Sequence, residues 1–400
     1  MTRPPLAVVP GPATPEEAPP PSGYVCFSAQ DWWYHNRAHS DFQLMRQVAG
    51  QRRVLVVNSI GMRMPVPGRS THVLRRIFRK LRSVAKFVRR PFPGFYVMSP
   101  LPLPLYGSRL GRRLGAALVR AQVRVVCLAL GLRRPVIVAT LPTAWDVVRP
   151  MRRRCLVYNR SDHHSAFPES GGTSIADMER ALLERADHVV YVSNTLMAQE
   201  RPITGERAYF LDHGVDLDHF TRVPPERRPA DLLAVPGPRI GFFGALDDFV
   251  VDFDLLDRLA EELPEASLVL IGDANGPTER LTRHRNVYWL GFRPYEQIPA
   301  YGSGFDVAIM PWLDNEWIRN SNPIKLKEYL ALGLPVVSTP FGELERYPDQ
   351  VITASGAADF AEAVRTALKE GGPLPAEELR SSVADAAWSV RAADLMRLVE

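Results

Sequence analysis

The stretch NSNPIKLKEYLALGLPVVSTP, residues 320–340, combines a loop, a helix start, a buried strand and a turn. Ser321 and Asn322 are good N-cap residues and Pro323 suits the first helical position, so a helix is predicted to begin here and to run through Ala331. The apolar run LPVVST, closed by a proline, then predicts a strand buried on both faces. The stretch is therefore half of a β-α-β unit.

The first turn of this helix carries the charges that a nucleoside diphosphate needs. A helix N-terminus favours a phosphate, and Lys325 adds a full positive charge. Glu328 lies about one turn further on the same face, where its carboxylate can accept both hydroxyls of a ribose. The alternative is an ordinary helix whose cap and charged face hold no ligand. We predict a donor site that contains Asn320, Ser321, Asn322, Pro323, Lys325 and Glu328.

At these residues the chain resembles the GT-B glycosyltransferases, specifically the large retaining group called family 4, and within it the bacterial polysaccharide and teichuronic-acid-type enzymes. In that family a helix before a strand like LPVVST binds the sugar nucleotide, and a glutamate at the place of Glu328 holds the ribose. The usual signature has another glutamate eight positions earlier, where this chain has Asn320. Residues 209–220, YFLDHGVDLDHF, are a second resemblance, because such a strand, glycine turn and Val-Asp tail often end the family's first domain.

Strand and helix patterns alternate along both halves, which predicts α/β domains with parallel sheets. The resemblance adds the GT-B fold, two Rossmann-like domains whose sheets face each other across a cleft. A segment rich in proline and charge suits the linker. We predict a disordered Pro-rich tail at 1–22, an acceptor- and membrane-facing domain at 23–223, the linker at 224–238, the nucleotide-sugar domain at 239–375 and a last helix at 376–400, which in GT-B enzymes often crosses back to the first domain.

The second half offers further donor-binding residues at the ends of its strands. Gly244 and Gly272 each follow an apolar strand, and a glycine lets backbone N–H groups approach a phosphate closely. Near the turn after the third strand, where the family binds the base, Phe292, Arg293 and Tyr295 could form a wall for the base, although they suit a surface turn equally well. The family commonly has an Arg and a Lys after the first strand, whereas this chain has Leu-Asp-Asp at 246–248. Lys325 and the helix N-terminus are therefore expected to supply most of the positive potential.

Charge is distributed unevenly along the chain. Up to Pro225 there are 32 Lys and Arg against 16 Asp and Glu, and the remainder has 17 against 28. No acidic residue occurs at 42–145, which predicts contact with an anionic surface. Residues 71–90 read as a basic amphipathic helix for an anionic membrane, although a core helix with a basic outer face, or nucleic-acid binding, are alternatives. The predicted membrane residues are Arg75, Arg76, Arg79 and Lys80.

Two loops of the first half are predicted to reach the acceptor. Loops after parallel strands bind ligands in open sheets, so Asp31, Trp32 and His35 are acceptor-site candidates, unless the tryptophan packs on the next helix. Asp162 and His163 follow the strand CLVYN, in a place where the resembling enzymes have an aspartate facing the cleft. Either can take the proton of an acceptor hydroxyl, and a capping role for the aspartate is the alternative.

The sequence predicts a protein of the cytoplasm that binds the inner face of the plasma membrane. The first 22 residues lack an apolar core, the longest apolar run is too short for a bilayer, and the three cysteines have no metal or redox spacing. Asp252-Phe253-Asp254 lies in a helical pattern, so we expect no metal and no cofactor.

The resemblance implies a glycosyltransferase that moves a sugar from a nucleotide-sugar donor, a UDP-sugar in our reading, to a lipid-linked or polysaccharide acceptor. A nucleotide-sugar epimerase, or a non-catalytic adaptor that binds a membrane or nucleic acid, are the alternatives. Retention and inversion of the sugar stereochemistry both stay open.

Overall fold

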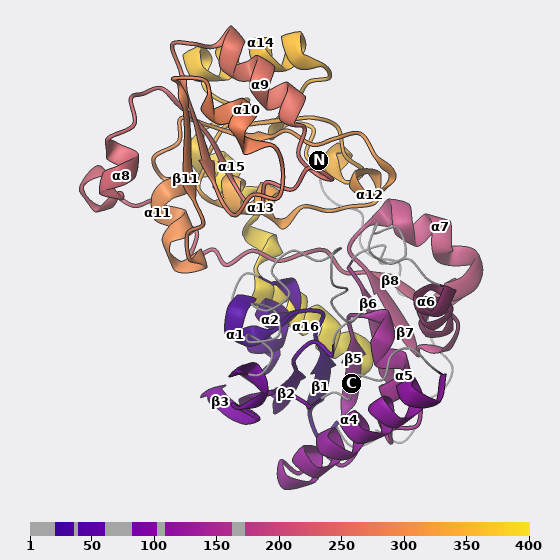
Figure 1. The fold of residues 1–400 in the computed structure, drawn as a ribbon. Coiled ribbons are helices and arrows are strands. Elements are labelled where there is room, and N and C mark those ends of the chain that lie inside the picture. Colours follow the sequence, from indigo (N-terminus) through magenta and orange to yellow (C-terminus); the bar gives the residue numbers. More distant parts are fainter. Residues whose placement is uncertain (1–20, 36–38, 61–81, 102–108, 162–172) are drawn as a thin grey trace.

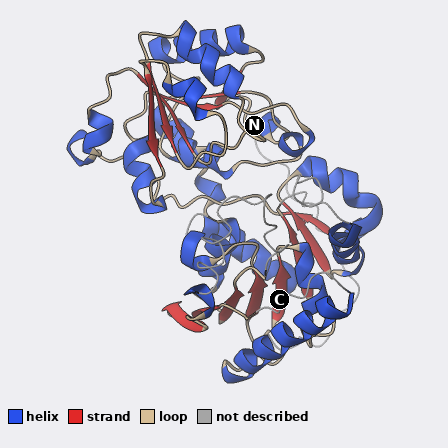
Figure 2. Cartoon of the chain, viewed as in Figure 1, coloured by secondary structure: helices blue, strands red, loops and turns tan. Residues whose placement is uncertain are grey.

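The computed structural model describes residues 21–35, 39–60, 82–101, 109–161 and 173–400, which form two α/β domains (Figures 1 and 2). Each domain holds one sheet with helices packed against it, as the strands drawn as red arrows in Figure 2 show. The predicted α/β class with two mainly parallel sheets is confirmed.

The first sheet has the strand order β3-β4-β2-β1-β5-β6-β7-β8. Neighbouring strands are parallel except for β3 and β4. The short apolar runs of β1, β2, β5 and β6 are buried along their whole length, as expected for strands covered on both faces. The strands are β1 (Tyr24–Phe27), β2 (Val54–Val57), β3 (Val88–Phe92), β4 (Phe95–Met98), β5 (Val136–Ala139), β6 (Leu156–Arg160), β7 (His188–Tyr191) and β8 (Ala208–Phe210).

Helices of the first domain cover both faces of this sheet. One face packs against α4, α5 and α6, and the other against α2. The helices are α1 (Trp32–His35), α2 (Ser40–Val48), α4 (Arg109–Ala129), α5 (Trp145–Val148), α6 (Thr173–Arg185) and α7 (Asn194–Thr204).

The predicted helix at 71–90 is wrong at its C-terminal end. Val88 begins strand β3, which turns back through a Pro-Gly pair to pair antiparallel with β4. Phe87 has a φ of 37°, and Pro91 lacks the N–H that a continuing helix requires, so the helical pattern cannot extend through these residues. The predicted membrane residues Arg75, Arg76, Arg79 and Lys80 lie outside the described residues.

The second sheet is parallel throughout, in the order β11-β10-β9-β12-β13-β14. Its strands are β9 (Arg239–Phe243), β10 (Ser267–Ile271), β11 (Val287–Gly291), β12 (Val307–Met310), β13 (Val336–Ser338) and β14 (Val351–Thr353). Helix α8 (Ala230–Leu233) lies within the predicted linker. The helices after the linker are α9 (Phe253–Glu262), α10 (Thr278–Thr282), α11 (Ile298–Gly302), α12 (Glu316–Arg319), α13 (Ile324–Ala331), α14 (Ala357–Glu370), α15 (Ala376–Ser381) and α16 (Trp388–Val399).

The last helix, α16, packs on the first domain and not on the second. Trp388, Leu395 and Met396 are buried in the same core as strand β1 and helix α2, and α16 lies beside α2 in Figure 1. The chain crosses between the domains at two adjacent places, because Val215 pairs with Ala387. The first sheet ends at Phe210 and the second begins at Arg239, on either side of the linker that we predict at 224–238.

Candidate functional site

The stretch 320–340 folds as loop, helix and strand, but the predicted capping is wrong. Helix α13 begins at Ile324, and its N-cap residue is Pro323, which has no side chain for capping. Ser321 donates its hydroxyl to the carbonyl of Ile318 at 3.0 Å, which closes the end of α12. Asn322 turns to the first domain, where its amide donates to the Val192 carbonyl at 2.8 Å. Both side chains find partners outside α13, so neither caps it.

Three of the predicted donor residues meet where the strands of the second sheet end. Gly244 and Gly272 have φ values of 142° and 147°, which side chains rarely allow. A Cβ on Gly272 would collide with the Gly244 carbonyl oxygen, and a Cβ on Gly244 would lie 2.5 Å from Lys325 Nζ. The two glycines therefore give the lysine a close approach to the backbone at the carboxyl ends of β9 and β10, where open α/β sheets bind ligands.

Lys325 lies against two aromatic rings. Its ammonium is 5.0 Å from the ring centre of Phe242 and 4.6 Å from that of Trp312. In the part of the chain that the structure describes, no carboxylate lies within ion-pair distance of it. Burial lowers the pKa of Lys325 to about 8, although the negative charge of Glu328 partly opposes this. The charge of Lys325 is therefore not neutralised by a direct partner and is suited to an anionic ligand.

Glu328 is buried one turn after Lys325 on α13. Burial raises the pKa of Glu328 to about 7, against the opposing effects of Lys325 and of a hydrogen bond from Tyr295. The Tyr295 hydroxyl donates to the carboxylate at 3.4 Å, and Gln43 of the first domain donates to the same hydroxyl at 3.3 Å. The carboxylate therefore has one weak donor and retains capacity for further hydroxyl donors.

Asn320 has an unpaired acceptor close to this helix. Its amide donates to the Glu316 carbonyl at 2.9 Å, whereas its side-chain oxygen is buried and has no hydrogen-bond partner among the residues that the structure describes. An unpaired buried acceptor costs about 1–3 kcal/mol, so a hydroxyl donor from a ligand would be favourable here.

The turn after β11 holds the residues that the sequence suggested as a wall for the base, and their side chains lie in different environments. Phe292 is exposed, at 59%. Arg293 is held on the surface by Asp231 at 2.7 Å. Tyr295 points inward instead, where His219 stacks on its ring with 4.7 Å between the centroids. Sequence reasoning offered Tyr295 only as a possible wall for the base and did not name Trp312, although Trp312 follows strand β12, which is the available signal.

The structure describes the side chains of two of the predicted acceptor residues, Asp31 and Trp32. Trp32 is 6% exposed and packs edge-on against Phe42, so its predicted acceptor role is wrong and the packing alternative holds. Asp31 accepts a hydrogen bond from the Ser83 hydroxyl at 2.6 Å. The His35 side chain lies outside the description, so its predicted role stays a prediction.

The predicted catalytic residues Asp162 and His163 also lie outside the described residues. The strand that leads to them ends in Arg160, whose side chain is fully buried between two carboxylates. Its guanidinium pairs with Glu179 at 2.5 Å and with Glu200 at 2.7 Å. This buried pairing fixes the end of β6, the strand that precedes Asp162 and His163 in the sequence.

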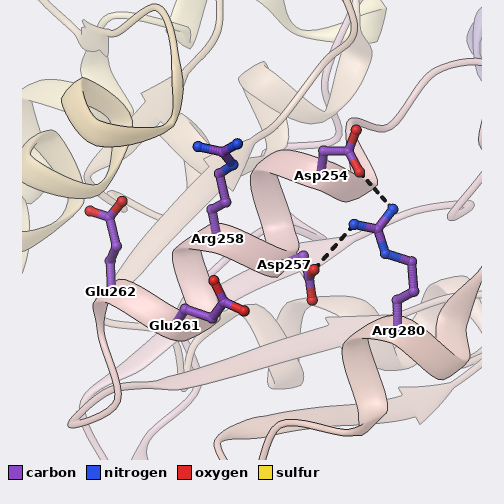
Figure 3. A pocket seen from close by; sticks show the side chains of 6 residues that line it. All are labelled: Asp254, Asp257, Arg258, Glu261, Glu262 and Arg280. Atoms are coloured by element: carbon purple, nitrogen blue, oxygen red, sulfur yellow. Dashed lines mark hydrogen bonds and ion pairs between the residues drawn. The ribbon is translucent and has the colours of Figure 1, made fainter.

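A charged hollow on the second domain is a separate feature (Figure 3). Two of its carboxylates are already paired: Arg280 contacts Asp254 at 2.6 Å and Asp257 at 3.2 Å, and Arg283 contacts Asp257 at 2.9 Å. Asp257, Glu261 and His284 are close enough to share a metal ion, but the guanidiniums neutralise Asp257 and oppose a cation. The hollow is lined by Asp254, Asp257, Arg258, Glu261, Glu262 and Arg280.

Two facing α/β domains, a crossing C-terminal helix and a charged site at the strand ends define the GT-B fold. Residues 237–370 match the protein family described as "Glycosyl transferases group 1", and these residues include the whole donor site. The resemblance to the GT-B glycosyltransferases is thereby confirmed.

One curated relative and two solved structures extend this likeness. The chain is 27% identical over 263 residues to the putative teichuronic acid biosynthesis glycosyltransferase TuaH of Bacillus subtilis (strain 168), a match that covers 60% of this chain and 63% of TuaH, less than two thirds of that protein. Anabaena Alr3699/HepE, solved with UDP, has a TM-score of 0.65 at 16% identity over 94% of this chain and 98% of its own. Sucrose-phosphate synthase of Thermosynechococcus elongatus has a TM-score of 0.67 at 15% identity over 94% and 97%. These structures show the fold.

Proposed function

We propose that the protein is a glycosyltransferase that takes a sugar from a nucleoside diphosphate, specifically a UDP-sugar, and transfers it to a lipid-linked or polysaccharide acceptor. The observation that carries this proposal is the pair Lys325 and Glu328 on α13, beside the glycine ends of β9 and β10. Among the described residues Lys325 is a cation without a carboxylate partner, and Glu328 is a carboxylate with spare acceptor capacity; the two match the two ends of a nucleotide diphosphate. The UDP complex of HepE supports the choice of nucleotide.

In the proposed reaction, the bond between the anomeric carbon and the diphosphate breaks and a bond to the acceptor oxygen forms. The departing diphosphate gains negative charge, which Lys325 and the N-terminus of α13 stabilise electrostatically without a metal. The acceptor hydroxyl loses its proton to a base of the first domain, for which Asp162 and His163 stay our prediction. The buried side-chain oxygen of Asn320 accepts a hydrogen bond from a hydroxyl of the nucleotide sugar.

A direct test is calorimetric titration of UDP, GDP and ADP into the wild-type protein and into Lys325→Met. A charge-assisted contact is worth about 2 kcal/mol, so the variant is expected to bind UDP about 30-fold more weakly. Lys369→Met, which changes an exposed lysine at the end of α14, is the control and should bind as the wild type does. Absence of UDP binding to the wild type at millimolar concentration, or an unchanged Lys325→Met, would refute the proposed donor site.

We further propose that the first domain binds the anionic inner face of the plasma membrane. Helix α4 exposes Leu110 at 68%, Leu114 at 50% and Leu128 at 64%, and at roughly 100° per residue these side chains share one face. Exposed Arg113 and Arg124 flank that face. The helix lies on the side of the first domain remote from the second (Figure 1).

Charge complementarity favours an anionic lipid surface as the partner of α4. No acidic residue occurs at 42–145, so nothing in this segment repels anionic headgroups. Among the described residues, no helix has both the length and the apolarity to cross a bilayer. Binding by an interfacial helix is consistent with this finding.

Flotation with phosphatidylglycerol vesicles tests the membrane proposal. Leu110→Asp with Leu114→Asp should abolish flotation, whereas Leu233→Asp, which changes an exposed leucine of the second domain, should not. Flotation of the double variant equal to that of the wild type would contradict the proposal.

A further inference from the structure

Asp212 of the first domain is buried beneath the donor helix of the second. It follows β8, and its carboxylate is 4% exposed. Its Oδ1 atom accepts from the amide of Asn322 at 2.7 Å and from the ammonium of Lys327 at 2.8 Å. Its Oδ2 atom accepts from Arg346 at 2.7 Å. One carboxylate of the first domain therefore binds three donors of the second.

Two of these donors belong to the segment that forms the donor site. Asn322 lies just before α13, and Lys327 lies between Lys325 and Glu328 on that helix. Because neighbouring residues of a helix point about 100° apart, Lys327 can reach the first domain while Lys325 reaches the glycine ends. Helix α13 has no side-chain cap, so the contacts with Asp212 fix its first turns in place of one.

A second carboxylate joins the domains beside the first. Glu343 accepts from the backbone N–H of Asn194 at 2.5 Å and from its side-chain amide at 3.0 Å. Arg346 lies 3.7 Å from Glu343 and also contacts Asp212, so it links the two carboxylates. The contacts are made by the loops after β7 and β8, which is where the first domain meets the donor helix.

The Asp212 carboxylate is ionised across the neutral range. Burial alone would raise the pKa of Asp212, but Lys327 and Arg346 outweigh burial and hold it well below its usual range. The Lys327 side chain is only 1% exposed, so loss of the carboxylate would leave a buried ammonium without its counter-ion. The arrangement of α13 relative to the first domain therefore depends on this one side chain.

We propose that Asp212 is a positioning residue that orients helix α13 for the nucleotide by fixing Asn322 and Lys327 to the first domain. This inference rests on the proposed donor site. Asp212 contacts none of the groups assigned to the nucleotide, and it acts through the helix that carries Lys325 and Glu328. Nucleotide affinity then depends on a carboxylate of the opposite domain.

The test compares Asp212→Asn with Asp257→Asn in the full-length protein. Asp257 is a matched control, because it is a buried carboxylate with two cationic partners, of which Arg280 is drawn in Figure 3. Both partners, Arg280 and Arg283, belong to the second domain. Both variants should lower the melting temperature. Only Asp212→Asn should weaken UDP binding in calorimetry, by about tenfold. Equal UDP affinity of Asp212→Asn and the wild type, or equal weakening in both variants, would overturn the proposal.

A double variant covers the case in which Asp212→Asn does not fold. Asp212→Asn with Lys327→Met removes both members of the buried ion pair and leaves no unpaired ammonium, so it should recover stability. Its UDP affinity should stay at least fivefold below that of the wild type, because the tie between α13 and the first domain is still missing. Recovery of wild-type affinity together with stability would also overturn the proposal.

Hydrogen exchange separates this inference from the proposed function. Without nucleotide, peptides covering α13 should exchange faster in Asp212→Asn than in Asp257→Asn. If the wild type binds no UDP but this difference in exchange is found, the proposed donor site is wrong, whereas the positioning of α13 by Asp212 is supported. If α13 exchanges alike in both variants, the coupling is wrong whatever the nucleotide result.

Discussion

Replacement of Glu328 by glutamine is predicted to make the nucleotide-free protein more stable and to weaken its binding of UDP. The carboxylate is buried in the donor site, and burial raises its pKa from 4.5 to about 7. A buried group with a raised pKa is unfavourable in its ionised form, and a neutral amide of the same shape removes that penalty. The same amide cannot supply a negative charge to the ribose hydroxyls.

The magnitude follows from the change in pKa. Below pH 4.5 the carboxylate is protonated in both the folded and the unfolded protein, so it contributes nothing to the pH dependence. Between pH 4.5 and about 7 only the unfolded state loses the proton, and the free energy of unfolding falls by about 1.4 kcal/mol per pH unit. Above pH 7 the full penalty of about 3 kcal/mol is present. In the variant, Lys325 no longer has the negative charge of Glu328 beside it, and this offsets part of the gain. We therefore expect the free energy of unfolding to rise by about 1–3 kcal/mol at pH 8.

The assay is differential scanning fluorimetry from pH 5 to pH 8.5 without nucleotide. At about 2–4 °C per kcal/mol, Glu328→Gln should raise the melting temperature by roughly 2–12 °C at pH 8 and by much less at pH 5. Calorimetry at pH 8 should show UDP affinity reduced by about 10- to 100-fold. Glu370→Gln, an exposed glutamate of α14, is the control and should change neither quantity.

Two outcomes would refute this reasoning. A variant that is destabilised at pH 8 would mean that the carboxylate makes compensating contacts in the folded protein. A gain that is equal at pH 5 and at pH 8 would mean that the charge is not its cause.

Two further predictions concern the same site. Gly244→Ala should lower stability and weaken UDP binding, because φ is 142° at this residue and the new Cβ would lie 2.5 Å from Lys325 Nζ, whereas Gly237→Ala, where a Cβ meets no atom within 4 Å, should leave UDP affinity unchanged. UDP affinity measured by calorimetry should be highest between about pH 7 and pH 8, since Glu328 gains its charge as pH rises through about 7 and Lys325 loses its charge as pH rises through about 8. A flat profile from pH 5.5 to pH 9.5 would contradict the assignment of these two groups.

The fold could be predicted from local patterns because each pattern has a physical cause that acts within a few residues. The buried strand after α13 follows from a short β-branched run, and the glycine ends of β9 and β10 follow from apolar runs that stop at Gly244 and Gly272. The same local reasoning failed at Ser321 and Asn322. Their side chains have N-cap chemistry, but Ser321 donates to the carbonyl of Ile318 in the preceding turn and Asn322 donates to the Val192 carbonyl of the first domain.

The roles of Trp32 and Asp212 could not be predicted from the sequence, because they depend on contacts with residues far away in the chain. The tryptophan at Trp32 suits an acceptor loop or a core equally well, and only the position of Phe42, Phe92 and Phe95 decides for the core. Asp212 stands 110 residues before its partner Asn322 and 134 before Arg346, so no spacing rule connects them. Its signal in the sequence is only an aspartate in a turn.

The environments of Lys325 and Glu328 suggest why the domains must be joined so firmly at this helix. A buried carboxylate with a raised pKa and a lysine with a lowered pKa both destabilise the nucleotide-free protein, and a short helix that carries both is poorly stabilised by its own sequence. Asp212 opposes this by tying the same segment to the first domain, through its buried ion pair with Lys327 and the hydrogen bond that it accepts from Asn322. The destabilising pair Lys325 and Glu328 and the stabilising contact of Lys327 with Asp212 lie on opposite faces of α13. A change in the contact between the domains is therefore expected to change nucleotide affinity as well.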